Sequence, residues 1–498
     1  MSFVDDLFAH PAGAPAIRTP DGHLSYGEVT DRIQRLARIL AGHGLEPEQV
    51  CAIAVDRGED AVIAMAAVAR AGGAFLALDA GLPHARLEAM CRTGGARMLV
   101  TTTALAERLS LPLTGPVVLI DQEAPPAAAT RLPEVTSHTL AYVSHTSGST
   151  GAPNAVLIEH GGLRSYLRAI GTDNGLGPGT VALQVAPIGY DASIRDVFAP
   201  LVAGGCVVLV PRARLLRPVE FADTVRAFGV TALLSVTPTF LGFMTGHEAA
   251  AAALRTVELV VSSGESLLPF LASGGRHLLP GGLVNQYGPT ECTMTSTRYP
   301  VPRDPVTTAD LIGTPIDGVS VWLLDQDHRP VLDGATGEVH IGGVGVARGY
   351  GGRPALTAER FVPDPFGPPG ARLYRTGDLA RRLLDGTLVY LGRMDRQLKI
   401  RGHRVDPAEI EGALLTHPAV TGAVLTADKD DQGRVSLSAH VVGELADVPD
   451  AALRAHLAES LPPHMMPRRF VRITRVPTTH SGKSDRAVLT RTDENGSR

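Results

Sequence analysis

The segment from His145 to Val156, HTSGSTGAPNAV, places two glycines and four hydroxyl side chains between an apolar run and a segment with helical spacing. Backbone N–H groups in a glycine-rich turn, together with such hydroxyls, can wrap phosphate oxygens. Gly148 and Gly151 would allow a close approach and unusual backbone angles. The spacing does not match the GxxxxGK[ST] pattern of a Walker loop. Taken alone, the segment is more typical of a flexible turn than of a nucleotide site, so the prediction depends on the rest of the chain.

Two other kinds of site are disfavoured by spacing. The glycine-rich segment GGVGVARG at Gly342–Gly349 does not match the GxGxxG pattern of dinucleotide-binding enzymes, so a dehydrogenase is not indicated. The cysteines form no CxxC pair and no cluster with histidine, so the sequence supports neither a zinc site nor a disulfide framework. They are Cys51, Cys91, Cys206 and Cys292.

Helical and strand patterns alternate from about residue 24 to Pro300. In LSYGEVTDRIQRLARILAGHGL, Val29, Ile33 and Leu36 are spaced for a helix that ends at glycine. CAIAV then follows as a buried strand, and later segments repeat the order helix, glycine, strand. This rhythm predicts mostly parallel sheets with helices on their faces.

The pattern changes after Pro300. Short apolar alternations separated by glycine, VSVWLLD, GEVHIGG and TLVYLG, predict antiparallel strands. A small α+β unit is expected after that. We place the boundary between Met394 and Asp395, which gives a large N-terminal part, residues 1–394, and a small C-terminal part, residues 395–498.

Composition restricts the partners. The chain has 498 residues and a formal net charge of −5, so no basic surplus indicates nucleic acid or an anionic membrane. The N-terminus has no apolar core of signal-peptide length. The most apolar region, Ala61–Leu82, is interrupted by Arg70 and by a glycine pair, which favours a buried helix and strand over a membrane span. We expect a cytoplasmic protein.

Ten segments of the chain, taken in order, resemble those of one protein family. Any one of these segments alone would be weak evidence. They closely resemble the adenylate-forming superfamily and, within it, a free-standing adenylation domain of a nonribosomal peptide synthetase. The resemblance covers nearly the whole chain. The segments are LSYGEV, RAGGAFLALD, HTSGSTGAPN, GYDASIRDVF, NQYGPTEC, GEVHIGGVGVARGY, YRTGDLARRL, GRMDRQLKIRGHRVDPAEIE, LPPHMMP and HSGKSDR.

The resemblance implies an α/β fold. The large N-terminal portion would have mostly parallel, helix-flanked sheets and a small distorted β-barrel, and the small α+β C-terminal domain would be mobile. The implied reaction is ATP-dependent activation of an amino acid as aminoacyl-AMP with release of pyrophosphate. A phosphopantetheine thiol on a carrier protein would then take the acyl group in trans.

Alternatives remain open at this point. One is a CoA ligase or an amide-forming ligase that uses the same adenylate, and another is a non-catalytic nucleotide-binding relative. An MbtH-type helper protein is a further candidate partner, and nothing in the sequence decides it.

The resemblance assigns roles to residues at matching positions. The loop Thr146, Ser147, Gly148, Ser149, Thr150 and Gly151 would cradle the β- and γ-phosphates of ATP. Tyr287 would stack on adenine, Thr290 would contact the α-phosphate, and Glu291 would bind Mg²⁺. Without the family resemblance, the simpler interpretation is that Glu291 is a solvated carboxylate in a loop.

Further roles fall on the second half of the chain. Asp378 and Arg393 would hold the ribose hydroxyls, and a carboxylate with two acceptor oxygens suits a diol. Asp395 would be the hinge of the C-terminal part. Lys483 would neutralise charge that develops in the transition state. The simpler alternatives are a surface ion pair for Asp378 with Arg393 and an exposed lysine.

The phosphate loop departs from the family pattern. The resemblance implies an ending Gly-x-Pro-Lys-Gly, whereas this chain has Asn154 and Ala155 at the last two positions. The main positive charge in the implied scheme comes from Mg²⁺ and Lys483. We therefore expect activity with weaker binding of ATP or pyrophosphate.

The segment GYDASIRDVF bears on the substrate. By resemblance, Asp191 would pair with the ammonium group of an amino acid, and the alternative is an N-cap for the following helix. Arg195 stands where many members have an apolar residue, and a desolvated guanidinium favours an anionic group. We expect an amino acid with an acidic or strongly polar side chain, unless Arg195 pairs with Asp196 or turns outward. The side-chain pocket would consist of Ala192, Arg195, Ser235, Val261, Ser263, Gln286, Met294 and Thr295.

Overall fold

The computed structural model describes residues 2–122, 131–148, 153–400, 402–429, 435–477 and 489. The chain divides into two compact units, of which the first comprises Met1–Ala80, Cys91–His145 and Ala155–Met394. The second comprises Gly81–Met90, Thr146–Asn154 and Asp395–Arg498. Two short segments of the N-terminal part, one of them the glycine-rich loop, therefore belong to the second unit.

The largest sheet has a parallel part, which confirms the predicted alternation. In the order β13-β12-β11-β9-β10-β1, neighbouring strands are parallel, and β2 adds an antiparallel edge. The strands are β1 (Pro15–Thr19), β2 (Gly22–Ser25), β9 (Val181–Leu183), β10 (Cys206–Val208), β11 (Ala232–Val236), β12 (Leu259–Ser263) and β13 (Gly282–Tyr287). Their helices are α6 (His160–Asp173), α7 (Ala192–Val202), α8 (Arg212–Leu215), α9 (Pro218–Phe228), α10 (Pro238–Thr245), α11 (Glu248–Leu254) and α12 (Leu268–Ala272).

The same sheet continues with antiparallel strands, as predicted for the region after Pro300. The predicted small distorted β-barrel does not close in the described residues: β15 pairs with β14 on one side and β21 on the other, so these strands extend the sheet. The strands are β14 (Thr297–Pro300), β15 (Asp310–Pro315), β16 (Val319–Leu324), β17 (Thr336–Gly343), β19 (Phe361–Pro363), β20 (Arg372–Arg382) and β21 (Leu388–Arg393). The short helices are η1 (Gly275–Leu278), η2 (Thr290–Cys292) and α13 (Pro354–Arg360).

A second sheet of seven strands has the order β18-β8-β7-β4-β3-β5-β6. Its strands are β3 (Val50–Ala54), β4 (Ala74–Ala77), β5 (Ala96–Thr101), β6 (Val117–Leu119), β7 (Leu140–Thr146), β8 (Asn154–Glu159) and β18 (Gly349–Tyr350). The N-terminal helices are α1 (Val4–Leu7), α2 (Tyr26–Gly42), α3 (Glu59–Arg70), α4 (His84–Gly94) and α5 (Thr103–Leu109).

The N-terminal helices follow the sequence closely. Ser25 and Glu28 form a capping box that starts α2, since each side chain accepts from the backbone N–H of the other. Residues 61–69 of α3 are all buried, as expected for the most apolar region of the chain. In the part of the chain that the structure describes, no helix combines the length and the apolar character that crossing a membrane would need.

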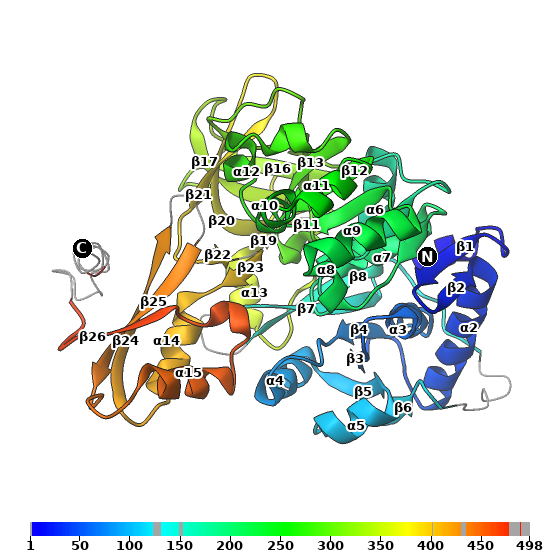
Figure 1. Ribbon diagram of the computed structural model, residues 1–498, viewed down its shortest axis with the longest axis horizontal. Coiled ribbons are helices and arrows are strands. Elements are labelled where there is room, and N and C mark those ends of the chain that lie inside the picture. Colours follow the sequence, from blue (N-terminus) through cyan, green and yellow to red (C-terminus); the bar gives the residue numbers. More distant parts are fainter. Residues whose placement is uncertain are drawn as a thin grey trace. The chain divides into compact units, whose positions relative to one another are not determined.

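The second unit contains a three-stranded sheet in the order β24-β25-β26, with β25 and β26 parallel (Figure 1). Its core includes Ile410 of α14 and Leu453 of α15. The C-terminal elements are β22 (Leu398–Ile400), β23 (His403–Val405), α14 (Pro407–Leu415), β24 (Val420–Lys429), β25 (Val435–Gly443), α15 (Asp450–Ala458), η3 (Pro463–Met465) and β26 (Arg469–Arg472). This is the α+β arrangement predicted for the end of the chain.

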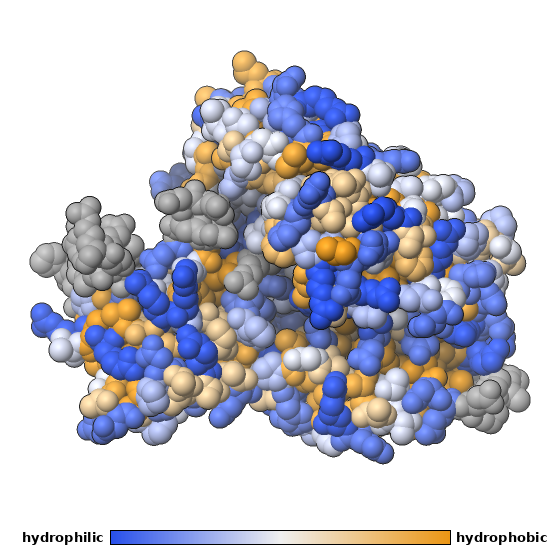
Figure 2. All heavy atoms as spheres, in the orientation of Figure 1, coloured by the Kyte–Doolittle hydropathy of each residue, from blue (hydrophilic) through white to orange (hydrophobic). Residues whose placement is uncertain are grey.

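The surface carries scattered apolar side chains. On the face shown in Figure 2, hydrophobic residues are interspersed among hydrophilic ones. Near α8 and α9, for example, Leu216 and Val219 are more than half exposed, but the helices there also present Arg212 and Arg217. Single exposed apolar residues of this kind are normal on soluble proteins and carry no functional argument.

Candidate active site

Asp191 lies at the start of α7 and is half-buried. Asp191 occupies the N-cap position but makes no side-chain capping hydrogen bond, so the predicted alternative as an N-cap is not what the structure shows. Its Oδ2 atom is buried and has no hydrogen-bond partner among the described residues. Burial raises the pKa of this carboxyl, while the Thr290 hydroxyl and the charge of Arg195 act in the opposite direction.

Arg195, one turn further along α7, points inward and is 2 % exposed. Its guanidinium donates only to neutral oxygens in the part of the chain described. They are Ser235 Oγ (2.9 Å), Ser263 Oγ (2.9 Å), Gln286 Oε1 (2.8 Å), Thr295 Oγ1 (3.2 Å) and Tyr166 Oη (3.3 Å).

The neighbouring acid Asp196 does not neutralise Arg195 directly. One Asp196 oxygen accepts from the backbone N–H groups of Val185 and Ala186, both at 2.8 Å. No ion pair joins Arg195 to a carboxylate among the described residues. Both alternatives raised from the sequence, a pair with Asp196 and an outward orientation, are therefore wrong.

The polar side chains around Arg195 come together because of the sheet. Ser235, Ser263 and Gln286 lie near the carboxyl ends of β11, β12 and β13, which are adjacent parallel strands. Ends of this kind form one edge of the sheet, where α/β proteins bind ligands. The predicted pocket residues Ala192, Val261, Met294 and Thr295 also lie in this region of the first unit, in α7, in β12 and just after η2.

Gln286 adds to this region a buried donor without a partner among the described residues. Gln286 Nε2 has no hydrogen bond in the described part of the chain, although Gln286 Oε1 accepts from Arg195. The hydroxyl of Tyr142, whose charged form would interact with Asp191, is likewise buried without a partner there. Buried polar atoms are normally satisfied, so these atoms indicate that a polar ligand completes the site.

Asp378 and Arg393 lie opposite each other on β20 and β21. Arg393 Nη1 donates to Asp378 Oδ1 at 2.8 Å, and Tyr390 donates to the same oxygen at 3.2 Å. Tyr287 Oη donates to Asp378 Oδ2 at 2.6 Å. Asp378 is 3 % exposed, so the simpler alternative of a surface ion pair does not describe it.

Glu291 is fully buried in the short helix η2. Tyr350 donates to its Oε1 atom at 2.7 Å, and the Tyr374 hydroxyl lies 3.2 Å from that of Tyr350. No group of three or more metal-ligating side chains occurs in the described residues. Mg²⁺ usually binds one or two carboxylates together with substrate phosphates, so a single buried carboxylate fits an ion that arrives with a nucleotide.

The glycine-rich loop belongs to the second unit and is described in part. The backbone N–H of Gly148 donates to Glu409 Oε2 at 3.3 Å, and Arg86 forms an ion pair with Glu409. The hydroxyls of Thr146 and Ser147 are buried and have no partner among the described residues. The predicted residues Ser149, Thr150, Gly151 and Lys483 lie outside the described residues.

The predicted hinge residue, Asp395, is the first residue of the C-terminal stretch of the second unit. Its Oδ1 atom accepts from the backbone N–H of Gln397 at 3.0 Å. The hinge role itself stays a prediction.

Sequence reasoning missed several polar contacts. Tyr166 on α6 touches Arg195, Tyr350 touches Glu291, Tyr390 touches Asp378 and Glu409 touches the loop. Periodicity gives no signal for them, because a buried tyrosine has the same pattern as any core aromatic residue. Tyr350 lies in the segment GEVHIGGVGVARGY, and Glu409 lies in GRMDRQLKIRGHRVDPAEIE. Membership of these family segments was the one sequence signal that could have pointed to them.

Comparison with known proteins decides the family. The family model described as "AMP-binding enzyme" matches residues 5–351, and the one described as "AMP-binding enzyme C-terminal domain" matches residues 409–483. The chain belongs to the AMP-binding enzyme family.

The relatives of this AMP-binding enzyme are much longer proteins. It is 36 % identical to tyrocidine synthase 3 of Brevibacillus parabrevis over 98 % of the chain, which is 8 % of that protein. It is 39 % identical to phosphinothricin tripeptide synthetase PhsB of Streptomyces viridochromogenes over 96 % of the chain and 40 % of that protein. The chain thus spans a minor part of the curated relatives it matches.

Solved structures show the same fold. The chain is similar to holo-PA1221, a protein with adenylation and carrier domains, with a TM-score of 0.86, 27 % identity and coverage of 98 % of this chain and 83 % of the other. It is also similar to the fused adenylation and carrier protein NpsA-ThdA from Klebsiella oxytoca, with a TM-score of 0.83, 25 % identity and coverage of 95 % and 93 %. The resemblance to adenylation domains of nonribosomal peptide synthetases is confirmed.

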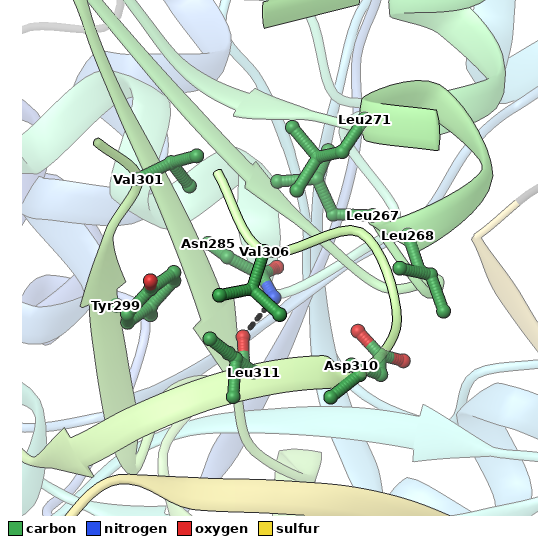
Figure 3. Close-up of a pocket in the computed structure, with 10 residues that line it drawn as sticks. Leu267, Leu268, Leu271, Asn285, Tyr299, Val301, Val306, Asp310 and Leu311 are labelled. Carbon is green, nitrogen blue, oxygen red and sulfur yellow. Dashed lines mark hydrogen bonds between the residues drawn. The ribbon is translucent and has the colours of Figure 1, made fainter. Parts of the chain in front are cut away.

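A small pocket lies apart from the predicted site (Figure 3). Leu267 and Leu271 from the region of α12 face Tyr299 and Val301 there. Asn285 donates its side-chain N–H to the backbone oxygen of Leu311 at 2.8 Å beneath them. None of the predicted nucleotide or substrate residues lines this pocket.

Proposed function

We propose that this enzyme activates an amino acid with ATP, forming aminoacyl-AMP and pyrophosphate. The observation that carries the proposal is the buried Asp191 Oδ2 atom, which has no hydrogen-bond partner among the described residues of an AMP-binding enzyme. A buried carboxylate is costly without a cationic partner. The ammonium group of an amino acid supplies that partner.

The chemistry forms one bond and breaks another. A substrate carboxylate oxygen attacks the α-phosphorus of ATP, and the bond between that phosphorus and the bridging oxygen of pyrophosphate breaks. Asp191 orients the amino acid through its ammonium group. Thr290 contacts the α-phosphate, and Lys483 stabilises the charge that develops on the reacting oxygens.

The nucleotide is held by other groups of the chain. Asp378 and Arg393 hold the ribose hydroxyls, with Asp378 as the acceptor. Tyr287 lies against adenine, and the loop that begins at Thr146 receives the outer phosphates. Glu291 is the carboxylate for Mg²⁺. When bound, Mg²⁺ neutralises phosphate charge and so eases both the approach of a carboxylate and the departure of pyrophosphate.

The substrate we propose has an acidic or strongly polar side chain. Arg195 is buried, is charged, and meets only neutral acceptors in the described residues. The unpartnered Gln286 Nε2 adds a donor beside it. A carboxylate or similar anion would neutralise the guanidinium and accept from both groups.

The acyl acceptor we propose is the phosphopantetheine thiol of a carrier protein. Support comes from similarity to adenylation domains solved together with carrier domains. The thiol attacks the acyl carbon of the adenylate, and AMP leaves. A CoA thiol or an amine could attack the same carbon. The test is to let the carrier thiol, CoA and an amine compete for one aminoacyl-adenylate and to measure which product forms. We assign no role to an MbtH-type helper.

The test of the proposed function is amino-acid-dependent exchange of labelled pyrophosphate into ATP. The panel contains acidic, basic, neutral and non-proteinogenic amino acids. We expect a sharp response to an acidic amino acid. A response confined to glycine or alanine would mean that Arg195 fills the pocket and does not recognise an anion. Silence across the panel with intact ATP binding would overturn amino-acid activation by this chain alone.

A further inference from the structure

The segment between β17 and β18, whose glycines fit no dinucleotide site, lies against the short helix that carries Glu291. The backbone N–H of Ala347 donates to the backbone oxygen of Glu291 at 2.9 Å. Thr293 Oγ1 donates to the backbone oxygen of Gly345 at 2.7 Å. A Cβ atom at Gly345 would lie 3.2 Å from the backbone oxygen of Cys292, which is tighter than usual. Glycine therefore allows this close approach.

The same segment ends in a side chain that reaches the carboxylate itself. Tyr350 Oη donates to Glu291 Oε1 at 2.7 Å, and both residues are buried. A hydrogen bond from a neutral hydroxyl to a carboxylate is charge-assisted and stronger than one between neutral groups. Glu291 is thus held through its backbone by Ala347 and through its side chain by Tyr350.

Tyr350 is fixed in turn by three kinds of contact. It pairs with Val156 across the antiparallel strands β18 and β8. Its backbone N–H donates to Thr357 Oγ1 at 3.0 Å. Its ring meets the ring of Phe361 edge-on, with centroids 5.5 Å apart, and its hydroxyl lies 3.2 Å from that of Tyr374. A side chain held in this way can define the orientation of the group it contacts.

We propose that Tyr350 is a positioning residue for Glu291, fixing the plane of the carboxylate that receives Mg²⁺ with the nucleotide. This proposal rests on the proposed function, in which Glu291 is the metal carboxylate. Hydrogen-bond partners of a metal-ligating carboxylate orient it, and their loss typically weakens metal binding about 10- to 100-fold. Tyr350 does not itself touch substrate or metal in this proposal.

The test separates metal binding from turnover. The dissociation constant of α,β-methylene-ATP, which cannot donate its adenylyl group, is measured by calorimetry with Mg²⁺ and with EDTA. The constant in EDTA divided by the constant in Mg²⁺ is the factor by which the metal tightens nucleotide binding, and this ratio reports the coupling between metal and nucleotide. In Tyr350→Phe, which keeps the ring and its packing, we expect the constant in EDTA to stay unchanged and the ratio to fall about 10-fold. In pyrophosphate exchange, the Mg²⁺ concentration for half-maximal rate should rise by a similar factor, with an unchanged KM for the amino acid.

Two variants make the result interpretable. Tyr26→Phe deletes another buried tyrosine hydroxyl, which donates to the backbone oxygens of Leu201 and Gly205 near the end of α7 that lies opposite Asp191. This variant should keep the wild-type ratio. Glu291→Gln should abolish the metal-dependent gain. A wild-type ratio in Tyr350→Phe alongside a loss in Glu291→Gln would overturn the proposal. So would equal weakening with and without Mg²⁺. An unchanged ratio in Glu291→Gln would overturn the metal assignment of the proposed function and this proposal with it.

Discussion

The hydroxyl of Tyr287 donates a 2.6 Å hydrogen bond to Asp378 Oδ2, across 91 residues of sequence. Arg393 and Tyr390 donate to the other oxygen of the same carboxylate. The residues proposed for adenine and for ribose are therefore one hydrogen-bonded network. Members of such a network do not contribute independently, because removing one changes what the others contact.

Substitutions in this network should be non-additive. Asp378→Asn should weaken binding of a non-hydrolysable ATP analogue by about 10-fold or more, since bonds to a charged group contribute about 1.5–3 kcal/mol. Tyr287→Phe should cost less, about 3- to 10-fold. The double variant should bind more tightly than the product of the two losses predicts, as measured by calorimetry. Losses that multiply would show that the two residues act separately.

Asp191→Asn should stabilise the free protein and weaken amino-acid binding. Burial raises the pKa of the Asp191 carboxyl, which means that its charged form opposes folding above that pKa and this cost disappears as the pH falls. At neutral pH the uncharged amide should therefore give a higher melting temperature. Amino-acid KM should rise at least about 10-fold, because the ammonium group loses its partner.

The pH dependence gives an independent test of Asp191. In the wild-type enzyme, amino-acid KM should rise as the pH falls, beginning at a higher pH than for an ordinary aspartate, because the carboxylate becomes protonated. Asp191→Asn should lack this dependence. A variant that loses stability and ATP affinity together would instead point to a structural role for the carboxylate.

Arg195→Met should abolish any preference for acidic amino acids. The thioether side chain fills part of the volume but carries no charge, so kcat/KM for an acidic substrate should fall about 100-fold or more, with a smaller change for neutral ones. The measurement is the pyrophosphate-exchange profile over the same panel. Arg195→Lys serves as the control, since it keeps the charge and loses the fork of donors. An identical profile in Arg195→Met would remove Arg195 from substrate selection.

Asn154→Lys should tighten the binding of ATP and pyrophosphate. Asn154 now donates weakly to the backbone oxygen of Ser147, at 3.5 Å, and supplies no charge. A lysine would add a cation for the phosphates, and the KM for ATP should fall about 3- to 10-fold. Ala155→Gly restores the other missing residue and controls for changes in loop flexibility. A KM that does not change in Asn154→Lys would place position 154 away from the phosphates.

Lys483→Ala should slow adenylation about 100-fold or more while ATP binding changes little, because the charge is needed in the transition state. Arg486→Ala, in the same HSGKSDR segment, is the matched control for loss of a nearby cation. Single-turnover formation of aminoacyl-AMP measures the step directly. A normal rate in Lys483→Ala would exclude the residue from the reaction.

The sequence predicted the elements well where one local pattern determined them. The spacing of Val29, Ile33 and Leu36 predicted α2, and the change of pattern after Pro300 matched the switch from parallel to antiparallel strands. Local sequence pattern could not predict whether the antiparallel strands close into a barrel. Closure depends on which edges pair, and β15 pairs with β14 and β21.

The site was predicted as residues but not as contacts. The family resemblance assigned Asp191 and Arg195 to the amino-acid substrate and Glu291 to Mg²⁺. No pattern could show that Asp196 would bond to the backbone N–H groups of Val185 and Ala186. Side-chain partners distant in sequence depend on the fold. Tyr166 lies 29 residues from Arg195, and its contact required the packing of α6 beside α7.

The neutral hydrogen-bond acceptors around Arg195 limit how this enzyme could be redesigned or could diverge. A change of Arg195 alone to an apolar residue would leave several hydroxyls and one amide in a buried site without the group they now accept from. Laboratory evolution toward an apolar amino acid should therefore proceed through variants altered at several positions together, with poor single-step intermediates. Libraries that randomise Ser235, Ser263, Gln286 and Thr295 along with Arg195 should outperform saturation of any one of these codons.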